Sequence, residues 1–304
     1  MVNVRVRITG GLGNQLFKFF HGYKLAQHFN VDLTLDTSWY KSQNLRNSKV
    51  SVRKFDLNFF PEIGNFKVHN SNFVFGDRWL ELIERRLGSS FQKLLDVYSE
   101  SNIWDKTSPP RVIYGNFEKL NYLPDPQIIC KFLISPSTSS PKFKSISEIL
   151  CRDEVAVLHI RRGDYLNLPD IYDVLDKNYY SAGLKNIESI QKLSNLIVFT
   201  DTENLQLPWL KEISSNYQII GPESNFSSAE TMLLMSHSKN LICANSTFSW
   251  WAAYLGTITY RTKNVVIPSR FNKIPGGNYT KDLFLNDWIC ITPEGKHHIP
   301  SNFA

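Results

Sequence analysis

Two adjacent arginines, Arg161 and Arg162, directly follow residues 155–158, an apolar segment with the composition of a buried strand. In open α/β sheets, ligands bind beyond the carboxyl ends of the strands, where these arginines would lie. Burying a guanidinium group is costly unless an anion or a carboxylate meets it. Two such groups beside Gly163, a residue that allows a close approach to the backbone, indicate a diphosphate site. The alternative that these residues leave open is a structural ion pair of an arginine with Asp164.

Polar side chains also lie at the ends of other predicted strands in this half of the chain. His159 precedes the arginines, Asp201 follows the next strand, and Ser246 and Thr247 follow a further strand and open a helix. The carboxyl ends of parallel strands share one edge of a sheet, and helix N-termini bind phosphate through their free N–H groups. We therefore predict a nucleoside diphosphate site, with the Asp201 carboxylate suited to the edge of a purine base. For Ser246 and Thr247, capping of the helix is the alternative.

A glycine-rich turn lies near the start of the chain. Residues 10–15, Gly-Gly-Leu-Gly-Asn-Gln, connect an alternating apolar strand to a helix. With Asp36 about twenty residues further on, the turn faintly resembles a dinucleotide fingerprint, but Leu16 occupies its third glycine position. A dinucleotide-dependent oxidoreductase is therefore a distant alternative, because it also leaves both arginines unexplained. Asn14 and Gln15 lie where the helix would open onto a cleft and are suited to binding hydroxyl groups, with capping of that helix as the alternative.

The order of the predicted elements indicates two domains. The second half of the chain alternates strand-like and helical segments, as parallel sheets with crossover helices do. The first residues read strand, helix, strand, and residues 135–141, rich in Ser and Pro, are the best candidate for a linker. We predict an α/β fold of two Rossmann-like domains, an N-terminal one over residues 1–140 and a C-terminal one over residues 141–304.

Composition limits the class of protein. The 304 residues are 42% hydrophobic and carry a net charge of +6 without a dense basic run, which suits a nucleotide partner and argues against nucleic acid. The four well-separated cysteines form no Cys-x-x-Cys pair and indicate neither a zinc site nor a disulfide framework. No signal peptide and no apolar run that would span a bilayer is apparent, so we expect a cytoplasmic protein with at most peripheral contact to the inner face of the plasma membrane.

Three segments, in the same order, resemble the bacterial α-1,2-fucosyltransferases of glycosyltransferase family 11. They are residues 10–17, 159–165 and 244–251, and further similar segments are residues 35–39, 199–201 and 230–235. The resemblance implies a GT-B-type enzyme of two Rossmann-like domains that face a central cleft. Such an enzyme moves L-fucose from GDP-β-L-fucose and inverts the anomeric centre. The resemblance also implies that no cofactor and no metal are needed, and the chain contains no Asp-x-Asp motif.

The resemblance assigns roles to individual residues. Arg161 and Arg162 would hold the diphosphate and stabilise the charge on the departing GDP. The donor-binding residues that it implies are His159, Arg161, Arg162, Asp164, Tyr165, Asp201, Glu230, Ser246, Thr247 and Phe248. The residues that it implies on the acceptor side are Gly11, Gly13, Asn14, Gln15 and Tyr172. Asn14 would also be catalytic, and the general base is not evident, with Asp36 and Glu118 as candidates. Asp36 is equally suited to capping the end of its strand.

Two places depart from the family pattern. Tyr172 and Asp173 stand where the family usually has a His-Gly pair, and residues 115–118 lack the usual aromatic-Gln pair. Both places are predicted to line the cleft, so the nearest alternative is a transferase of another GDP-sugar. A binding module that presents residues 162–164, Arg-Gly-Asp, as an adhesive tripeptide is a further alternative, which the preceding apolar strand argues against.

The expected function is transfer of L-fucose in α-1,2 linkage to a galactose-like hydroxyl of a surface glycan, such as a lipopolysaccharide O-antigen unit. The expected partners are a GDP-sugar donor and an oligosaccharide acceptor, free or lipid-linked.

Overall fold

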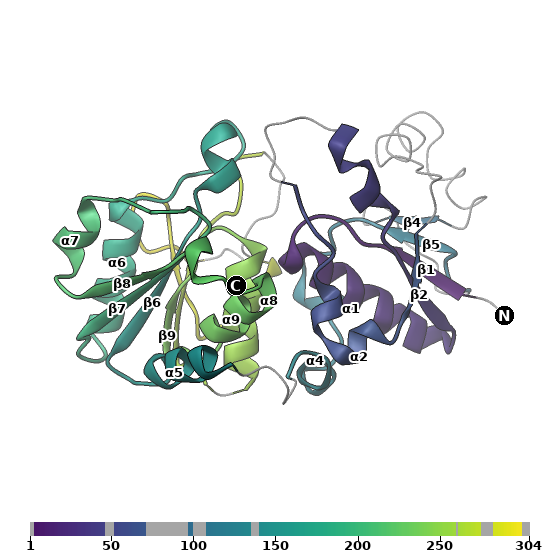
Figure 1. Cartoon of the computed structure of the whole chain (residues 1–304), viewed down its shortest axis with the longest axis horizontal. Helices are drawn as coiled ribbons and strands as arrows, with labels where there is room; N and C mark the ends of the chain where they lie inside the picture. Colours follow the sequence, from purple (N-terminus) through teal and green to yellow (C-terminus); the bar gives the residue numbers. More distant parts are fainter. Residues whose placement is uncertain are drawn as a thin grey trace. The chain divides into compact units, whose positions relative to one another are not determined.

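The fold is seen in a computed structural model that describes residues 3–45, 52–70, 97–99, 108–134, 140–259, 261–274 and 282–299. These residues fall into two compact units, one within Met1–Ser48 and Val52–Ser135 and the other within Pro136–Ala304. Each unit is built on a parallel sheet with helices packed against it (Figure 1). The predicted α/β class with two Rossmann-like halves is therefore confirmed. The domain boundary between residues 140 and 141 stays a prediction. The arrangement of the two halves around a central cleft also stays a prediction.

The first unit contains a five-stranded parallel sheet in the order β3-β2-β1-β5-β4. Its elements are β1 (Asn3–Arg7), α1 (Leu12–Phe29), β2 (Asp32–Asp36), α2 (Pro61–Gly64), β3 (Lys67–His69), β4 (Val97–Ser99), β5 (Val112–Tyr114) and α4 (Pro126–Leu133). Val4 and Val6 of β1 are fully buried, as the alternation of apolar and polar residues in this strand predicts. Leu16 and Phe19 of α1 are also fully buried, so the helix packs on the sheet. The glycine-rich turn consequently lies at the carboxyl end of β1.

The second unit contains a six-stranded parallel sheet in the order β11-β10-β9-β6-β7-β8. Its strands are β6 (Val155–Ile160), β7 (Asn195–Thr200), β8 (Tyr217–Ile220), β9 (Asn240–Ile242), β10 (Asn264–Pro268) and β11 (Ile289–Ile291). Its helices are α5 (Pro141–Leu150), α6 (Lys177–Glu188), α7 (Trp209–Ile213), α8 (Ser228–Met235) and α9 (Thr247–Ile258). Every residue of β6 is buried, which a strand covered by helices on both faces requires.

The strand order of the second sheet fixes where a ligand site can form. From β6 the chain proceeds through α6 and α7 to β7 and β8 on one side, then returns through α8 to β9 on the other side of β6. Figure 1 shows α6 and α7 on one face of this sheet and α8 and α9 on the other. The carboxyl ends of β6 and β9 therefore flank the point at which the winding direction reverses, the usual ligand position in such sheets.

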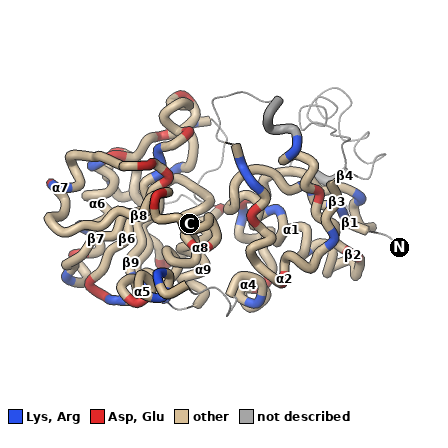
Figure 2. Tube along the Cα trace, viewed as in Figure 1, with Lys and Arg blue, Asp and Glu red and all other residues tan. Residues whose placement is uncertain are grey.

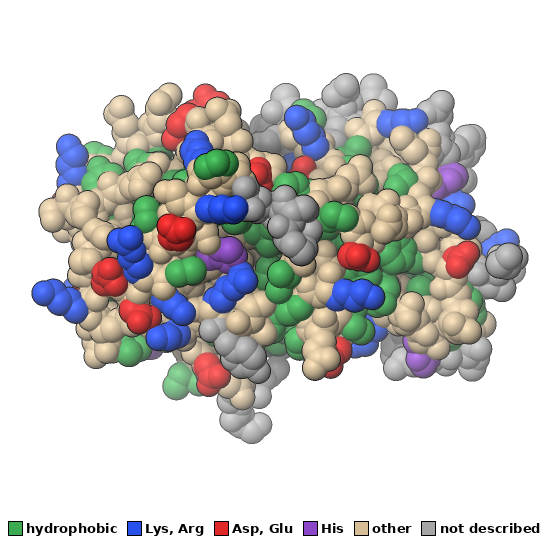
Figure 3. Space-filling model, turned by 60° about the horizontal axis from the view of Figure 1, so that its bottom comes forward, with side chains coloured by type: hydrophobic (Ala, Val, Ile, Leu, Met, Phe, Trp, Pro, Cys, Tyr) green, Lys and Arg blue, Asp and Glu red, His purple; other side chains and the backbone are tan. Residues whose placement is uncertain are grey.

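Charged side chains of both signs are distributed over both units. Figure 2 shows Lys and Arg interspersed with Asp and Glu along the trace, and Figure 3 shows the same mixture on one face of the surface. Among the residues that the structure describes, no helix is long and apolar enough to cross a membrane.

Candidate active site

Loops from three strands meet at the carboxyl edge of the second sheet. The Tyr165 hydroxyl, in the loop after β6, donates a hydrogen bond of 2.9 Å to the Asn245 carbonyl, which follows β9. The backbone N–H of Arg162 donates to the Asp201 carboxylate at 3.0 Å, which links this loop to the end of β7. The ring centroids of His159 and Phe248 lie 5.6 Å apart. The structure thus brings together the predicted donor residues of these three loops.

Arg161 is neutralised by two carboxylates of the chain. Its guanidinium group lies 2.5 Å from the nearer oxygen of Asp164 and 2.7 Å from that of Asp201, and its side chain is 14% exposed. Burial acts to lower the pKa of Arg161, but the carboxylates of Asp201 and Asp164 outweigh it and raise the pKa above its ordinary value. The guanidinium carbon also lies 5.2 Å from the centre of the Tyr165 ring. The structural ion pair, which the sequence left open as an alternative, describes Arg161.

Arg162 differs from Arg161 in its side-chain environment. It is half-buried, and only its backbone N–H is held, by Asp201. Its guanidinium group has no hydrogen-bond or ion-pair partner among the described residues. A partly buried cation without a partner is costly unless an anion binds there. Arg162 is therefore the arginine that this structure leaves available to a ligand.

Gly163 is required for a reason other than the one that we predicted from the sequence. A Cβ atom at this position would lie 2.2 Å from an Asp201 carboxylate oxygen, the one that pairs with Arg161. The absence of a side chain therefore admits the Asp201 carboxylate, whereas the expectation was that it admits the ligand. Any other residue here would displace Asp201 and break the ion pair.

Helix α9 begins directly at this edge. The Ser246 hydroxyl accepts a hydrogen bond from the Phe248 N–H at 3.3 Å, so it caps the helix, as the alternative for this residue proposed. Thr247 is the first helical residue and is half-buried. The start of a helix of this length carries a partial positive charge. It lies at the same edge as Arg162, so two features that attract anions occur together.

His159 is a buried, uncharged group among these arginines and carboxylates. It is 4% exposed, and its Nδ1 atom has no hydrogen-bond partner among the described residues. Burial lowers the pKa of His159 to about 4; the Asp201 carboxylate opposes this shift, and the Arg161 guanidinium adds to it. The imidazole is therefore uncharged at neutral pH and is suited to a neutral hydrogen bond with a base or a ribose.

Two predicted residues of the second unit have structural partners. The Glu230 carboxylate accepts hydrogen bonds from the backbone N–H and the hydroxyl of Ser227, which forms the capping box of α8. Tyr172, predicted on the acceptor side, stacks on Tyr165 with ring centroids 4.0 Å apart and planes 6° from parallel. Tyr172 therefore belongs to the edge that holds the donor residues.

Gln15, predicted to bind acceptor hydroxyls, instead holds the glycine-rich turn of the first unit. Its side chain is fully buried, and its amide donates to the carbonyls of Gly10 at 3.0 Å and Lys54 at 2.7 Å. Its amide oxygen accepts the Asp56 N–H at 2.9 Å. Both amide hydrogens are thus in use. Gly10 adopts φ 81°, and a Cβ atom there would lie 3.2 Å from Asn14.

The remaining predicted residues of the first unit lie along the carboxyl edge of its sheet. Gly11 caps α1, Gly13 is buried in its first turn and Asn14 is half-buried beside them. Asp36 ends β2 and accepts the Ser38 N–H at 3.0 Å, the capping role that its position suggested. Glu118 is 7% exposed and follows β5. Because β1 pairs with both β2 and β5, the loops that carry these residues are neighbours.

Sequence reasoning did not find several buried polar groups. Asn245 is 1% exposed, and its amide donates to the backbone carbonyls of Asp173 and Phe271 at 3.0 and 3.2 Å. Lys18 of α1 is 3% exposed, with its ammonium group 2.6 Å from the Thr9 hydroxyl. Asn245 could have been found from its position at the end of a predicted strand. Lys18 could have been found because it lies among the apolar residues of a predicted helix.

The chain is a parallel α/β protein of two Rossmann-like units. Residues 144–292 match the family model described as glycosyl transferase family 11. This match supports the coarse class of the chain, which is that of a glycosyltransferase.

Individual proteins show the same similarity. The O-antigen biosynthesis glycosyltransferase WbnK of Escherichia coli is 27% identical over 93% of this chain and 99% of the relative. An alpha-1,2-colitosyltransferase of Escherichia coli is 27% identical over 83% of this chain and 87% of the relative. Among solved structures, the fucosyltransferase NodZ from Bradyrhizobium has a TM-score of 0.48 at 13% identity, covering 82% of this chain and 91% of that one. The ADP-heptose heptosyltransferase II of E. coli has a TM-score of 0.44 at 13% identity, covering 98% and 93%.

The two arginines are expected to respond differently to substitution. Arg161→Ala leaves two carboxylates without their cation, so it should lower the free energy of unfolding by about 3 kcal/mol. Arg162→Ala removes no side-chain hydrogen bond or ion pair among the described residues and should leave stability within about 0.5 kcal/mol of the wild type. It should instead weaken GDP binding by at least about tenfold, through loss of a charged hydrogen bond. Urea unfolding and calorimetric titration measure the two effects, and an equal loss of stability in both variants contradicts the assignment.

The low pKa of His159 predicts a dependence of stability on pH. Above the ordinary histidine pKa of about 6.5, both folded and unfolded states are neutral and His159 contributes no pH dependence. Between this value and about 4, only the unfolded state binds the proton, so stability falls as the pH falls. We expect the unfolding free energy to drop from pH 6 to pH 5 by about 1 kcal/mol more in the wild type than in His159→Gln. Identical slopes in urea unfolding would show that His159 is protonated normally in the fold.

Proposed function

We propose that this glycosyltransferase moves L-fucose from GDP-β-L-fucose to a galactose-like hydroxyl, forming an α-1,2 linkage with inversion. The observation that carries the proposal is the half-buried Arg162, at the same sheet edge as the start of α9, whose guanidinium group has no ion-pair partner among the described residues. A nucleoside diphosphate supplies that anion, and Arg is suited to bidentate contacts with phosphate oxygens. The names of the relatives, an O-antigen glycosyltransferase and an alpha-1,2-colitosyltransferase, support a glycan acceptor and a 1,2 linkage.

In the proposed reaction, an acceptor hydroxyl displaces GDP directly from the anomeric carbon. Negative charge then builds on the β-phosphate, where the Arg162 guanidinium group and the positive end of α9 stabilise it. Arg161 keeps its pairs with Asp164 and Asp201, so that its role is to hold the loop that carries Arg162. Neutral His159 binds the nucleoside. This charge stabilisation replaces the divalent cation of metal-dependent transferases, and metal independence is part of the proposal.

The acceptor hydroxyl must lose its proton during the displacement. We infer that the base is one of the two carboxylates at the carboxyl edge of the first sheet, Asp36 or Glu118. Glu118 is the more buried of the two, and Asp36 already caps the turn that follows β2. Asn14, at the start of α1, is the proposed contact for an acceptor hydroxyl.

The acceptor is proposed to be an oligosaccharide of the O-antigen type, carried on a lipid. The proposed location is the cytoplasm, with contact to the inner face of the plasma membrane, because a lipid-linked acceptor would be met there. The name of the relative WbnK supports the acceptor class.

A second candidate is transfer of another GDP-sugar by the same residues. Two observations favour it: a relative is named for colitose, and Tyr172 and Asp173 depart from the family pattern beside the donor residues. Colitose is fucose without its 3-hydroxyl group. A donor that differs by one hydroxyl leaves the diphosphate contacts unchanged, so Arg162 serves both candidates.

A donor panel tests the function. The purified chain is incubated with a β-galactoside and GDP-fucose, GDP-colitose, GDP-mannose or UDP-galactose, and products are analysed by mass spectrometry and linkage analysis. We expect an α-1,2-fucosylated product from GDP-fucose and none from the uridine donor. Removal of divalent cations with EDTA should leave the rate unchanged.

Each arm of the panel has an outcome that contradicts part of the proposal. Exclusive use of GDP-colitose would replace fucose by the second candidate. A rate that EDTA abolishes and a divalent metal restores would refute metal independence. Product from the uridine donor alone would refute the GDP-sugar site.

A further inference from the structure

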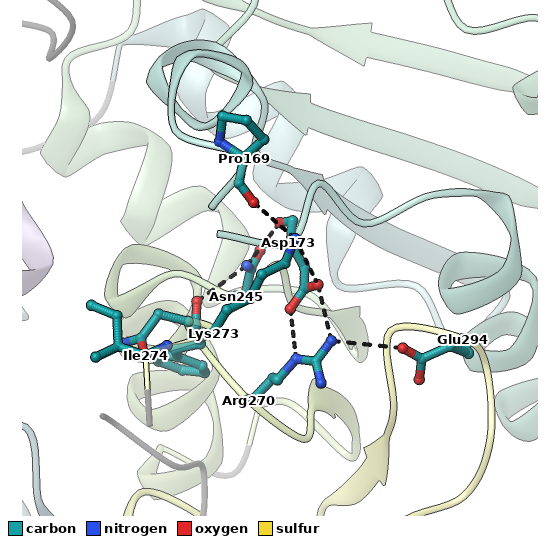
Figure 4. A network of polar contacts seen from close by, with 9 residues as sticks. Pro169, Asp173, Asn245, Arg270, Lys273, Ile274 and Glu294 are labelled. Atoms are coloured by element: carbon teal, nitrogen blue, oxygen red, sulfur yellow. Dashed lines mark hydrogen bonds and ion pairs between the residues drawn. The ribbon is translucent and has the colours of Figure 1, made fainter. Parts of the chain in front are cut away.

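Two loops at the carboxyl edge of the second sheet are joined by an ion pair to which no role in donor binding was assigned. One loop, residues 169–173, follows the turn after β6, and the other, residues 269–274, follows β10. Arg270 donates to both carboxylate oxygens of Asp173, from Nε at 2.7 Å and from Nη2 at 3.0 Å (Figure 4). Lys273 adds a hydrogen bond of 2.8 Å to the Pro169 carbonyl. We call the Asp173–Arg270 pair the loop clasp.

The loop clasp differs from an ordinary surface ion pair. The Asp173 side chain is only 12% exposed and that of Arg270 is 38% exposed, whereas the side chains of the Lys177–Glu212 pair are 45% and 55% exposed. Exposed pairs contribute little to stability. A bidentate guanidinium–carboxylate pair with one partner nearly buried instead fixes the mutual orientation of the segments that carry it.

The loop clasp is connected to the start of α9 through Asn245. The Asn245 amide donates to the backbone carbonyl of Asp173 at 3.0 Å and to that of Phe271 at 3.2 Å, so it bridges the two clasped loops (Figure 4). Asn245 immediately precedes Ser246, the cap of α9. A displacement of Asp173 would therefore disturb the residue directly before the cap of α9.

The loop clasp is also connected, through Tyr172, to residues 161–165, which follow β6 and which we call the arginine loop. Tyr172 precedes Asp173 in the chain and stacks on Tyr165 at 4.0 Å. The Tyr165 hydroxyl donates to the Asn245 carbonyl at 2.9 Å, and its ring lies beneath the Arg161 guanidinium group. Asp173 thus has continuous contacts to both anion-binding features, the loop that carries Arg162 and the helix start.

We propose that the Asp173–Arg270 pair is a positioning device that sets the arginine loop against the start of α9 and thereby the affinity for the donor diphosphate. The proposal rests on the proposed function, because it takes the donor to be a GDP-sugar. Asp173 and Arg270 are positioning residues that act through Asn245 and Tyr165. They determine how well the donor binds, while the displacement itself depends on Arg162 and the base.

The test uses the full chain with Asp173→Asn and Arg270→Gln, singly and together. Each variant should raise the Kd for GDP and the KM for the donor about tenfold, because coupled networks of this kind carry interaction energies of that size. The kcat and the acceptor KM should stay unchanged. The double variant should lose little more than the poorer single variant, since both changes remove the same pair. The other ion pairs of these residues, Arg270 with Glu294 at 3.7 Å and Asp173 with Lys273 at 3.8 Å, are longer. Arg270→Lys should not restore binding, because an ammonium group lacks the two-pronged geometry.

Asp153→Asn is the matched control. It removes the same charge from the same unit and breaks the Asp153–Lys263 pair, whose side chains are 62% and 56% exposed, beyond the opposite edge of the sheet. GDP binding should be unchanged in this variant. Thermal unfolding of each protein establishes that it is folded before its binding is compared.

The outcomes separate this inference from the function on which it rests. A wild-type chain that binds GDP, with clasp variants that bind it equally well, overturns the positioning role alone. A similar loss of affinity in Asp153→Asn, or a fall in kcat with an unchanged donor KM, also overturns it. A folded wild-type chain that neither binds GDP nor uses any GDP-sugar overturns the proposed function, and this inference with it.

Discussion

The second unit depends on the ion pairs that surround the Arg161 guanidinium group. A buried sheet strand that ends in an arginine must provide it with negative charge, and Asp164 and Asp201 do so from the following turn and from the neighbouring strand. That requirement fixes other features of the loop. It makes Gly163 necessary, because a side chain there would collide with Asp201, and it ties the Arg162 backbone to the same carboxylate. With both carboxylates engaged by Arg161, the next arginine is left for a ligand.

Strand order brings the second anion-binding feature to the same place. Because the winding reverses between β6 and β9, the arginine loop and the start of α9 lie at adjacent strand ends. Tyr165, Asn245 and Asp173 then connect them through hydrogen bonds and ring stacking. In the first unit, too, strand order brings loops together at the carboxyl edge of the sheet. The glycine-rich turn after β1 lies next to the ends of β2 and β5. The side chain of Gln15 is buried and its hydrogen bonds hold the turn. The groups left to contact an acceptor at this edge are therefore Asn14, Asp36 and Glu118.

Much of the architecture could be predicted from the sequence, because periodicity and strand ends are local properties. The alternating valines predict β1, and an apolar run predicts β6. The parallel topology that follows from the order of elements then places His159, Asp201 and Ser246 at one edge of the sheet. Side-chain pairing was less accessible, because it depends on contacts between distant segments. The sequence could not tell which of two adjacent arginines is neutralised. The capping role of Glu230 was accessible, because Ser-x-x-Glu over residues 227–230 is the pattern of a capping box. The clasp joins residues 97 positions apart, and only the departure at Asp173 hinted at it.

The central claim is that Arg162 and the start of α9 form the diphosphate site while Arg161 remains paired within the chain. A crystal structure of the full chain with GDP tests it most directly. The account predicts the diphosphate oxygens against the Arg162 guanidinium group and the first residues of α9, with Asp164 and Asp201 still bonded to Arg161. A diphosphate bound at the glycine-rich turn of residues 10–13, or one that displaces Asp201 from Arg161 and leaves Arg162 without contact, would contradict it.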